Sequence, residues 1–285
     1  MMRLSSTGCL RELQLTAPLI IALTLLGFLG ASQTARAQTG FSLGDAANFV
    51  LLDEGYGTNT LSFGAGTIDG NIGIGDPTNG NTSLSFASGA YVNGSIDFAG
   101  SQGTVSGTSA GTATIQSGVT GVQTDLLYLN NLSTTLGGET GTTLNVNLSA
   151  NQSQTINASS GHLDANGNYV FTVNAFTFTK GSTLTINGDG LGHNVVINFT
   201  NAGINPNFDG AIKITGGLTS SDVLFNVSSG ATLNFSDNSS TISGTFLDPN
   251  GSIAGSSVTI DGHVYGGGNS NMEIVNGTNV ISSNQ

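Results

Sequence analysis

The chain has 285 residues, of which only 8% are charged, and it contains 43 glycines and no tryptophan. Its formal net charge is −12 at pH 7, and beyond residue 37 only Lys180 and Lys213 oppose sixteen carboxylates. Nucleic-acid binding requires clustered Lys and Arg, so this charge balance excludes a nucleic-acid-binding protein. The abundance of Gly, Ser and Asn is typical of disorder, but 37% of residues are hydrophobic and fall in short alternating runs, which favours a folded chain.

Residues 1–37 have the features of an export signal. Arg3 and Arg11 supply a positive start, and the apolar segment 17–31 follows. That segment is shorter than the roughly 20 residues that span a membrane, and Ala35-Arg36-Ala37 is a small-x-small cleavage pattern. We therefore expect a signal peptide of residues 1–37, cleavage after Ala37, and a secreted protein that is extracellular or at the cell surface.

The mature chain, residues 38–285, is expected to form a single domain without thiols. The only cysteine, Cys9, lies in the leader, so no disulfide and no Cys-based site are predicted. No second apolar segment of spanning length follows, and the mature chain is expected to have no transmembrane segment.

Short apolar runs with a period of two recur along the mature chain, as in Leu144–Leu148 and Leu184–Ile186. This alternation predicts strands with one buried face, separated by Gly, Asn, Ser and Asp turns. A weak repeat of a β-branched pair, a small polar residue, Gly, any residue and an apolar residue accompanies the runs. Its glycines are Gly70, Gly94, Gly244 and Gly262. The spacing fits coils of a β-solenoid with Gly at the corners, and a β-sandwich is the alternative.

One segment departs from this pattern. Between residues 115 and 136, apolar residues recur every three or four positions, which predicts one amphipathic helix over approximately 115–136. Gly118 and Gly121 disfavour its first turns, so we expect the helix to be best formed from Thr120 to Leu136. Gly137-Gly138 is expected to end it. We expect the apolar stripe to pack against the side of the β body, and a partner-binding helix is the alternative.

Three patterns that can carry catalysis or metal binding are weak in this chain. Ser109 lies in a Gly-x-Ser-x-Gly match, but hydrolases with this elbow need many helices between parallel strands. His162, His193 and His263 are scattered beside turn residues, and we expect exposed loop histidines rather than a metal set. Residues 164–168 resemble the start of a calcium loop but lack its later ligands, which favours a hairpin turn through Asn166-Gly167.

The chain lacks the residue pattern that carbohydrate-active enzymes built on β-helices use for catalysis. Lyases of this type need Arg or Lys, and glycosidases need paired carboxylates. Asp53 and Glu54 are adjacent, so on a strand they would face opposite sides. We therefore predict no catalytic residue, no cofactor and no metal, and a protein that is not an enzyme.

A polar surface is the remaining candidate for function. Thr177 and Thr179 alternate with phenylalanines, and Thr183 and Thr185 alternate with aliphatic residues. If the apolar residues point inward, these four threonines point outward and can form a flat array that binds a surface. The alternative is that Thr is simply favoured in strands.

The C-terminal third resembles a known family. Segments 221–227, 231–233, 242–253 and 260–264 resemble the bacterial choice-of-anchor A family, an adhesive β-helical domain of exported proteins, although Asp248 stands where that family has Ala. Residues 129–136 are similar to the helix of that family. Near the N-terminus, residues 43–52 and 68–75 are similar to the opening of the ice-binding β-helix family.

Both resemblances imply an all-β fold with one helix, a right-handed parallel β-solenoid with an α-helix packed alongside, and neither implies catalysis. We predict a secreted, non-enzymatic adhesive protein of extracellular-matrix type that binds an extracellular surface or matrix polymer through a flat polar face. Two alternatives remain: an ice-binding (antifreeze) protein that uses an outward Thr-rich face, and a carbohydrate-active β-helix enzyme.

Overall fold

The computed structural model describes residues 40–55, 60–75, 83–101, 103–236, 240–268 and 271–282. These residues belong to one compact unit, Gln38–Gln285. The predicted signal peptide, residues 1–37, lies outside the described residues. No helix in this part of the chain is long and apolar enough to cross a membrane.

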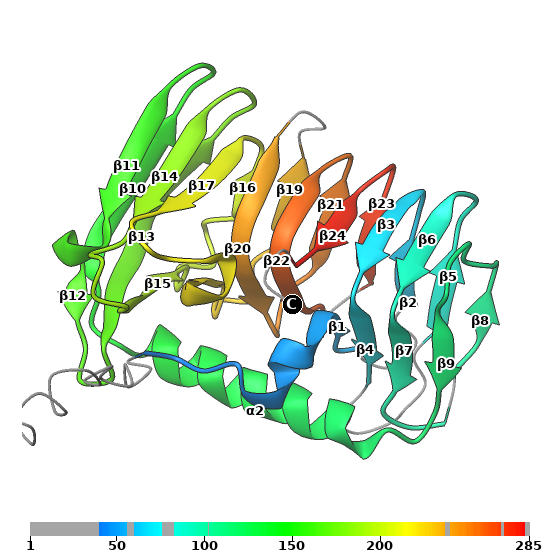
Figure 1. Cartoon of the computed structure of the whole chain (residues 1–285). Coiled ribbons are helices and arrows are strands. Elements are labelled where there is room, and N and C mark those ends of the chain that lie inside the picture. The colour runs from blue at the N-terminus through cyan, green and yellow to red at the C-terminus, as the bar shows by residue number, and fades with distance from the viewer. Residues whose placement is uncertain are drawn as a thin grey trace, which may run out of the picture. The chain divides into compact units, whose positions relative to one another are not determined.

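Parallel strands stack into the three sides of a solenoid, named here sheets A, B and C (Figure 1). Sheet A consists, in spatial order, of β13 (Asn168–Phe178), β15 (Asn194–Asn198), β18 (Val223–Asn226), β20 (Thr241–Asp248), β22 (Thr259–Gly266), β1 (Phe49–Asp53), β4 (Asn71–Ile74), β7 (Ser95–Phe98) and β9 (Thr114–Gln116). Sheet B consists of β11 (Ser153–Asn157), β14 (Thr183–Asn187), β17 (Ala211–Thr215), the first halves of β20 and β22, β24 (Asn279–Ile281), β3 (Gly66–Asp69) and β6 (Ala90–Asn93).

Sheet C has seven strands: β16 (Asn207–Phe208), β19 (Leu233–Ser236), β21 (Ile253–Ser256), β23 (Met272–Val275), β2 (Thr60–Phe63), β5 (Ser83–Phe86) and β8 (Val105–Ser106). At the other end of the solenoid, β10 (Thr142–Leu148) pairs with β13. The short β12 (His162–Leu163) forms the one antiparallel pair of the described strands, also with β13. Three single turns of 3-10 helix complete the elements: η1 (Gly44–Asn48), η2 (Ala158–Ser160) and η3 (Ser220–Asp222).

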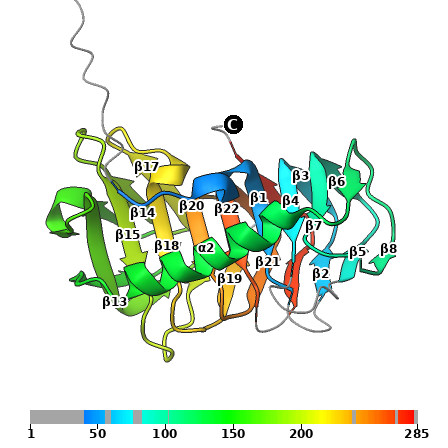
Figure 2. The same cartoon turned by 90° about the horizontal axis from the view of Figure 1, so that it is seen from below.

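The chain begins in the middle of the solenoid. In sheet A, β1 lies between β22 and β4, and in sheet B, β24 lies between β22 and β3. The first coils run from there to the end formed by β8 and β9. The helix α2 (Thr120–Gly137) then returns along sheet A to the opposite end, from which β10 to β24 stack back to the start (Figures 1 and 2). The first and last strands are therefore neighbours.

Glycines at the bend between sheets B and A allow the coils to stack closely. Gly244 and Gly262 pair in register within β20 and β22, and both have φ of 143°. A Cβ atom on Gly262 would lie 2.0 Å from the carbonyl oxygen of Gly244. Gly70 and Gly94 make the same bend with φ of 141° and 157°. The predicted role of these four glycines at solenoid corners is thus confirmed.

The helix begins at the residue expected for its best-formed part. It spans Thr120–Gly137. The wider range of approximately 115–136 starts too early, because Ile115 belongs to β9 and pairs with Ile96 of β7. Gly118, with φ of 71°, separates that strand from the helix. The predicted stripe does pack against the β body: Val122, Leu126, Leu129 and Leu136 are buried in one cluster with Leu224, Leu247 and Tyr265 of sheet A.

Strand pairing decides between the two predicted β architectures. All pairs except β12–β13 are parallel and connect successive coils, which a β-sandwich of antiparallel sheets would not show. The inward side chains of the three sheets form one continuous apolar cluster. The structure therefore confirms a parallel β-solenoid with one α-helix packed alongside.

Candidate functional surface

The outward side of sheet A is closed, whereas those of sheets B and C are open. Helix α2 and the segment that leads into β1 cover sheet A, with Phe41, Leu43 and Ala46 buried between them (Figure 2). Along sheets B and C the outward side chains are exposed or half-buried over most of the strands. Sheets B and C are therefore the open faces on which an extended ligand can lie.

Small hydroxyl side chains form two rows across one end of sheet B. Thr183 stands in register with Ser153 on β11, and Thr185 stands in register with Thr155. On the next strand, β17, Ala211 and the exposed Lys213 occupy the same two levels, so the hydroxyl rows span β11 and β14. Parallel strands lie roughly 4.8 Å apart, and alternate residues of a strand lie roughly 6.7 Å apart, so these hydroxyls form a regular lattice.

Beyond Ala211 the first row resumes in the middle of sheet B, and it ends at β6, where Tyr91 pairs with Thr67. Thr241 of β20 pairs with Thr259 of β22, and Thr259 pairs with Asn279 of β24. The amide oxygen of Asn279 accepts a hydrogen bond of 2.9 Å from the backbone N–H of Thr67 on β3. Every coil in this stretch thus contributes a small polar side chain at the same level.

A third row borders this surface and is held by side-chain hydrogen bonds. The amide of Asn187 donates to the amide oxygen of Asn157 at 3.0 Å, and the hydroxyl of Thr215 donates to the amide oxygen of Asn187 at 3.1 Å. These two bonds connect side chains on three successive strands, β11, β14 and β17, so they fix the orientation of this polar row relative to the sheet.

The structure brings together two of the four threonines predicted to bind a surface. Thr183 and Thr185 lie side by side on β14. Thr177 lies on β13 and pairs with Asn147 of β10. Thr179 lies in the corner between β13 and β14, where its hydroxyl donates to the carbonyl oxygen of Leu148 at 3.0 Å. The predicted alternation of threonines with apolar residues is present in both strands. The corner between β13 and β14, however, places Thr177 and Thr179 outside the lattice of sheet B.

Sequence reasoning also missed members of the lattice. Ser153, Thr155, Thr241 and Thr259 share the rows of Thr183 and Thr185 or continue them. A signal for two of them was present, because Thr241 and Thr259 both stand two residues before the serine or aspartate that precedes the corner glycine. The repeat therefore marked the outward position as well as the corner.

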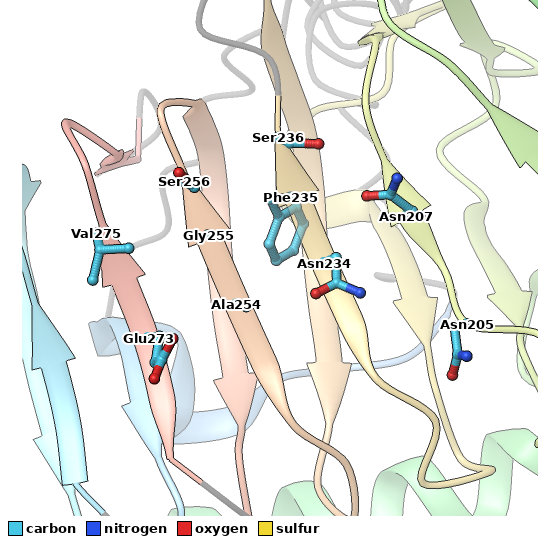
Figure 3. Close-up of a pocket in the computed structure, with 10 residues that line it drawn as sticks. All are labelled: Asn205, Asn207, Asn234, Phe235, Ser236, Ala254, Gly255, Ser256, Glu273 and Val275. Atoms are coloured by element: carbon cyan, nitrogen blue, oxygen red, sulfur yellow. The ribbon is translucent and has the colours of Figure 1, made fainter.

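Sheet C carries a shallow hollow of about 450 Å³ across β16, β19, β21 and β23 (Figure 3). Asn207, Asn234, Ala254 and Glu273 occupy one level of the four strands, each in register with the next. The hollow exists because Ala254 is shorter than the Asn and Glu side chains on either side. The full lining is Asn205, Asn207, Asn234, Phe235, Ser236, Ala254, Gly255, Ser256, Glu273 and Val275.

The residues considered for catalysis or calcium binding have structural partners. The Ser109 hydroxyl accepts a hydrogen bond of 3.0 Å from the backbone N–H of Val92, at the free edge of β6. The carboxylate of Asp164 accepts hydrogen bonds from the backbone N–H groups of Asn166 and Asn168. This closes the hairpin between β12 and β13, with Gly167 at φ of 88°, as predicted.

The three histidines differ in their surroundings, and the expectation of exposed loop histidines was wrong for His263. His162 is exposed, whereas His263 lies on β22 and is buried. Its Nδ1 is 2.8 Å from the carbonyl oxygen of Phe49, and burial lowers its pKa. The N-terminal segment that covers sheet A hides this position, which no local pattern reveals.

His193 contacts Asp189 in the loop between β14 and β15. Burial acts to raise the pKa of Asp189, but hydrogen bonds from His193 and from the backbone N–H of Leu191 outweigh it, so the pKa is lowered. The ring of Tyr169 meets that of His193 edge-on at 5.3 Å. Within the described residues, no group of three or more His, Cys, Asp or Glu is arranged to hold a metal ion.

The fold and these open faces define a β-helix protein with extended polar surfaces. The chain belongs to the family described as "Putative Ice-binding-like adhesive domain", whose model matches residues 32–276. This membership confirms the predicted resemblance to adhesive and ice-binding β-helices. No curated protein sequence matches the chain.

Solved structures of ice-binding proteins have the same fold. The protein of the Antarctic ascomycete Antarctomyces psychrotrophicus is 16% identical with a TM-score of 0.56, and the match covers 87% of this chain and all of that one. The Arctic yeast protein LeIBP is 15% identical with a TM-score of 0.52, with 86% and 95% covered. A protein of an Antarctic bacterium of the Flavobacteriaceae is 21% identical with a TM-score of 0.53, with 84% and 46% covered. At these identities the likeness concerns the fold.

Proposed function

We propose that this protein is a secreted, non-enzymatic adhesive protein that binds an extracellular surface or a matrix polymer through the outward face of sheet B. The observation that carries the proposal is the lattice of Ser153, Thr155, Thr183 and Thr185. Short hydroxyl side chains at the same two levels of β11 and β14 present a flat array of donors and acceptors to another flat object, and Lys213 of β17 borders this array.

Several observations support binding rather than catalysis. Asp53 and Asp248, which are 1% and 0% exposed, are closed off from any substrate. The family description is that of an adhesive domain. A carbohydrate-active enzyme needs two accessible carboxyl groups on either side of a glycosidic bond, and neither of these two residues meets that requirement.

Adsorption to a solid tests the proposal directly. We would compare the wild-type protein with Thr185→Tyr and with the matched variant Thr177→Tyr on silica, polystyrene and crystalline cellulose, with a quartz crystal microbalance. Thr185→Tyr places a bulky ring in the lattice, whereas Thr177 lies on β13 beyond the corner. We expect Thr185→Tyr to lose most adsorption and Thr177→Tyr to retain it. Equal adsorption by all three proteins on every surface would contradict the proposal.

Ice is a second candidate for the bound surface, favoured by the fold shared with the ice-binding proteins and by the threonine rows. If ice is the target, micromolar protein will inhibit ice recrystallisation, and Thr185→Tyr will abolish this while Thr177→Tyr will not. If recrystallisation proceeds unchanged with the wild-type protein, ice is ruled out and adhesion to other surfaces stands.

Export is part of the proposal and rests on residues 1–37. We expect the protein recovered from culture medium to begin at Gln38, which N-terminal sequencing will show. Retention of the intact N-terminus on a cell-associated protein would overturn this part of the proposal without affecting the surface itself.

A further inference from the structure

The hollow of sheet C lies on a different side of the solenoid from the threonine lattice. Its floor follows β21, where the short outward side chain of Ala254 leaves space above the strand. Asn234 on β19 and Glu273 on β23 stand in register on either side of Ala254. Figure 3 shows these side chains along neighbouring strands of one sheet. The volume of about 450 Å³ is within the range of sites that bind small molecules.

The lining offers hydrogen-bonding groups of both kinds. Asn207 and Asn234 carry carboxamides, which both donate and accept, and Glu273 carries a carboxylate, which accepts only. The Ser256 hydroxyl accepts from the Asn276 amide at 3.1 Å and can still donate. The side chain of Val275 and the methyl group of Ala254 add small apolar areas between these groups.

The charge around the hollow restricts the ligand. Glu273 lies at one end, and at the other end the carboxylate of Asp209 accepts a hydrogen bond of 3.1 Å from Ser236. No Lys or Arg is among the lining residues. These carboxylates repel an anion, and the amides and hydroxyls between them are neutral. A neutral molecule rich in hydroxyl groups satisfies donors and acceptors together.

We propose that this hollow binds a segment of a neutral glycan, with sugar hydroxyls on Asn207, Asn234 and Glu273 and the C–H faces over Ala254 and Val275. The four strands from β16 to β23 place Asn207 and Glu273 roughly 14 Å apart, a length suited to a linear chain of a few sugar units. The protein then has two binding surfaces, a flat one on sheet B and this groove on sheet C.

Matched substitutions inside and outside the hollow test the proposal. Ala254→Tyr fills the hollow, and Ala110→Tyr makes the same change at an exposed alanine between β8 and β9, outside both proposed binding surfaces. Binding of cellohexaose, chitohexaose and maltohexaose to the full mature chain is measured by isothermal titration calorimetry. We expect at least one of the three to bind the wild-type protein and Ala110→Tyr equally, and Ala254→Tyr to lose binding.

Two further measurements sharpen the result. Glu273→Gln keeps the shape but removes the charge, and loss of one charge-assisted hydrogen bond should weaken binding about tenfold. Polygalacturonate, an anionic glycan, should not bind, because the carboxylates of Glu273 and Asp209 repel its carboxylates. Circular dichroism and the urea midpoint establish that each variant is folded.

Several outcomes would overturn the glycan site. The first is the absence of heat with all three hexasaccharides at millimolar concentration. The second is an equal loss of binding in Ala254→Tyr and Ala110→Tyr. The third is a cationic oligolysine peptide that binds while the sugars do not. Because Thr185→Tyr and Ala254→Tyr lie on different sheets, failure of adsorption through sheet B leaves this test intact, and the reverse also holds.

Discussion

Asp53 of β1 and Asp248 of β20 stand in register with the same residue, Gly266 of β22, one from each side. The two carboxyl groups therefore belong to coils on either side of β22, although they come from opposite ends of the mature chain. Both are buried. Burial raises the pKa of Asp248 to about 8, against the opposing effect of the Gly251 N–H. Burial, with the charge of Glu54, also raises that of Asp53 well above its ordinary value.

Stability should consequently fall as the pH rises. In the unfolded chain an Asp carboxyl loses its proton near pH 4, whereas folded Asp248 keeps it until about pH 8. Between these values the folded state binds more protons, so Asp248 lowers the free energy of unfolding by about 1.4 kcal/mol per pH unit. The part of the free energy of unfolding that depends on the protonated Asp248 carboxyl is fully present below pH 4 and is lost as the pH approaches 8.

Urea unfolding at pH 4.5, 6 and 7.5 measures this slope. Asp248→Asn cannot ionise and should unfold with a shallower pH dependence and greater stability than the wild-type protein at pH 7.5. Glu273→Gln, an exposed position on β23, is the matched control and should keep the wild-type slope. If the free energy of unfolding of the wild-type protein rises from pH 4.5 to 7.5, Asp53 and Asp248 do not determine its pH dependence.

Asn226 links helix α2 to sheet A and should be costly to replace. Its amide donates to the Ser133 carbonyl oxygen at 3.0 Å and to the Asn198 amide oxygen at 2.8 Å, and its own oxygen accepts from the Ser133 hydroxyl at 2.6 Å. Asn226→Ala leaves these buried groups without partners, so we expect a loss of about 2–4 kcal/mol in chemical denaturation. Ser133→Ala removes one bond and should cost less. Similar losses of stability in Asn226→Ala and Ser133→Ala would contradict a hydrogen-bond network centred on Asn226.

The corner glycines should tolerate no side chain. Gly262→Ala would place a Cβ 2.0 Å from the Gly244 carbonyl oxygen at a φ that L-residues rarely adopt, and we expect a loss of more than about 3 kcal/mol or failure to fold. In Gly121→Ala, the new methyl group meets nothing within 4 Å at the start of α2. That variant should gain up to about 1 kcal/mol. A stable Gly262→Ala protein would disprove the close stacking at this corner.

Tyr265 should hold the N-terminal segment against sheet A. Its hydroxyl lies 2.9 Å from the carbonyl oxygens of both Ala46 and Phe49. Tyr265→Phe keeps the ring but removes the donor in a buried site, at a cost of about 1–2 kcal/mol. Hydrogen exchange should increase locally in residues 41–49 and remain unchanged in β14. Uniform acceleration of exchange would instead indicate global destabilisation.

The sequence was sufficient for the architecture. Period-two alternation identified strands such as Leu184–Ile186, the Gly70 and Gly262 repeat identified corners, and the spacing from Val122 to Leu136 identified the helix with its buried side. These features are local, because the periodicity of side chains and the freedom of φ act within one strand or one turn. Only the wider range, which started the helix at residue 115, was too long, because Ile115 pairs with Ile96 in a contact between coils.

The candidate surface depended on tertiary structure. Whether Thr177 and Thr185 share a face is decided by the turn at Thr179–Ser182, where the Ser182 N–H donates to the Thr179 carbonyl oxygen at 3.0 Å. The lattice and the hollow both arise from residues on different coils, brought into register only by parallel stacking. Composition and pattern thus predicted a solenoid with few charges on its outer faces. The order of its coils alone determined which side chains meet, because register between distant strands is set by packing of the whole core.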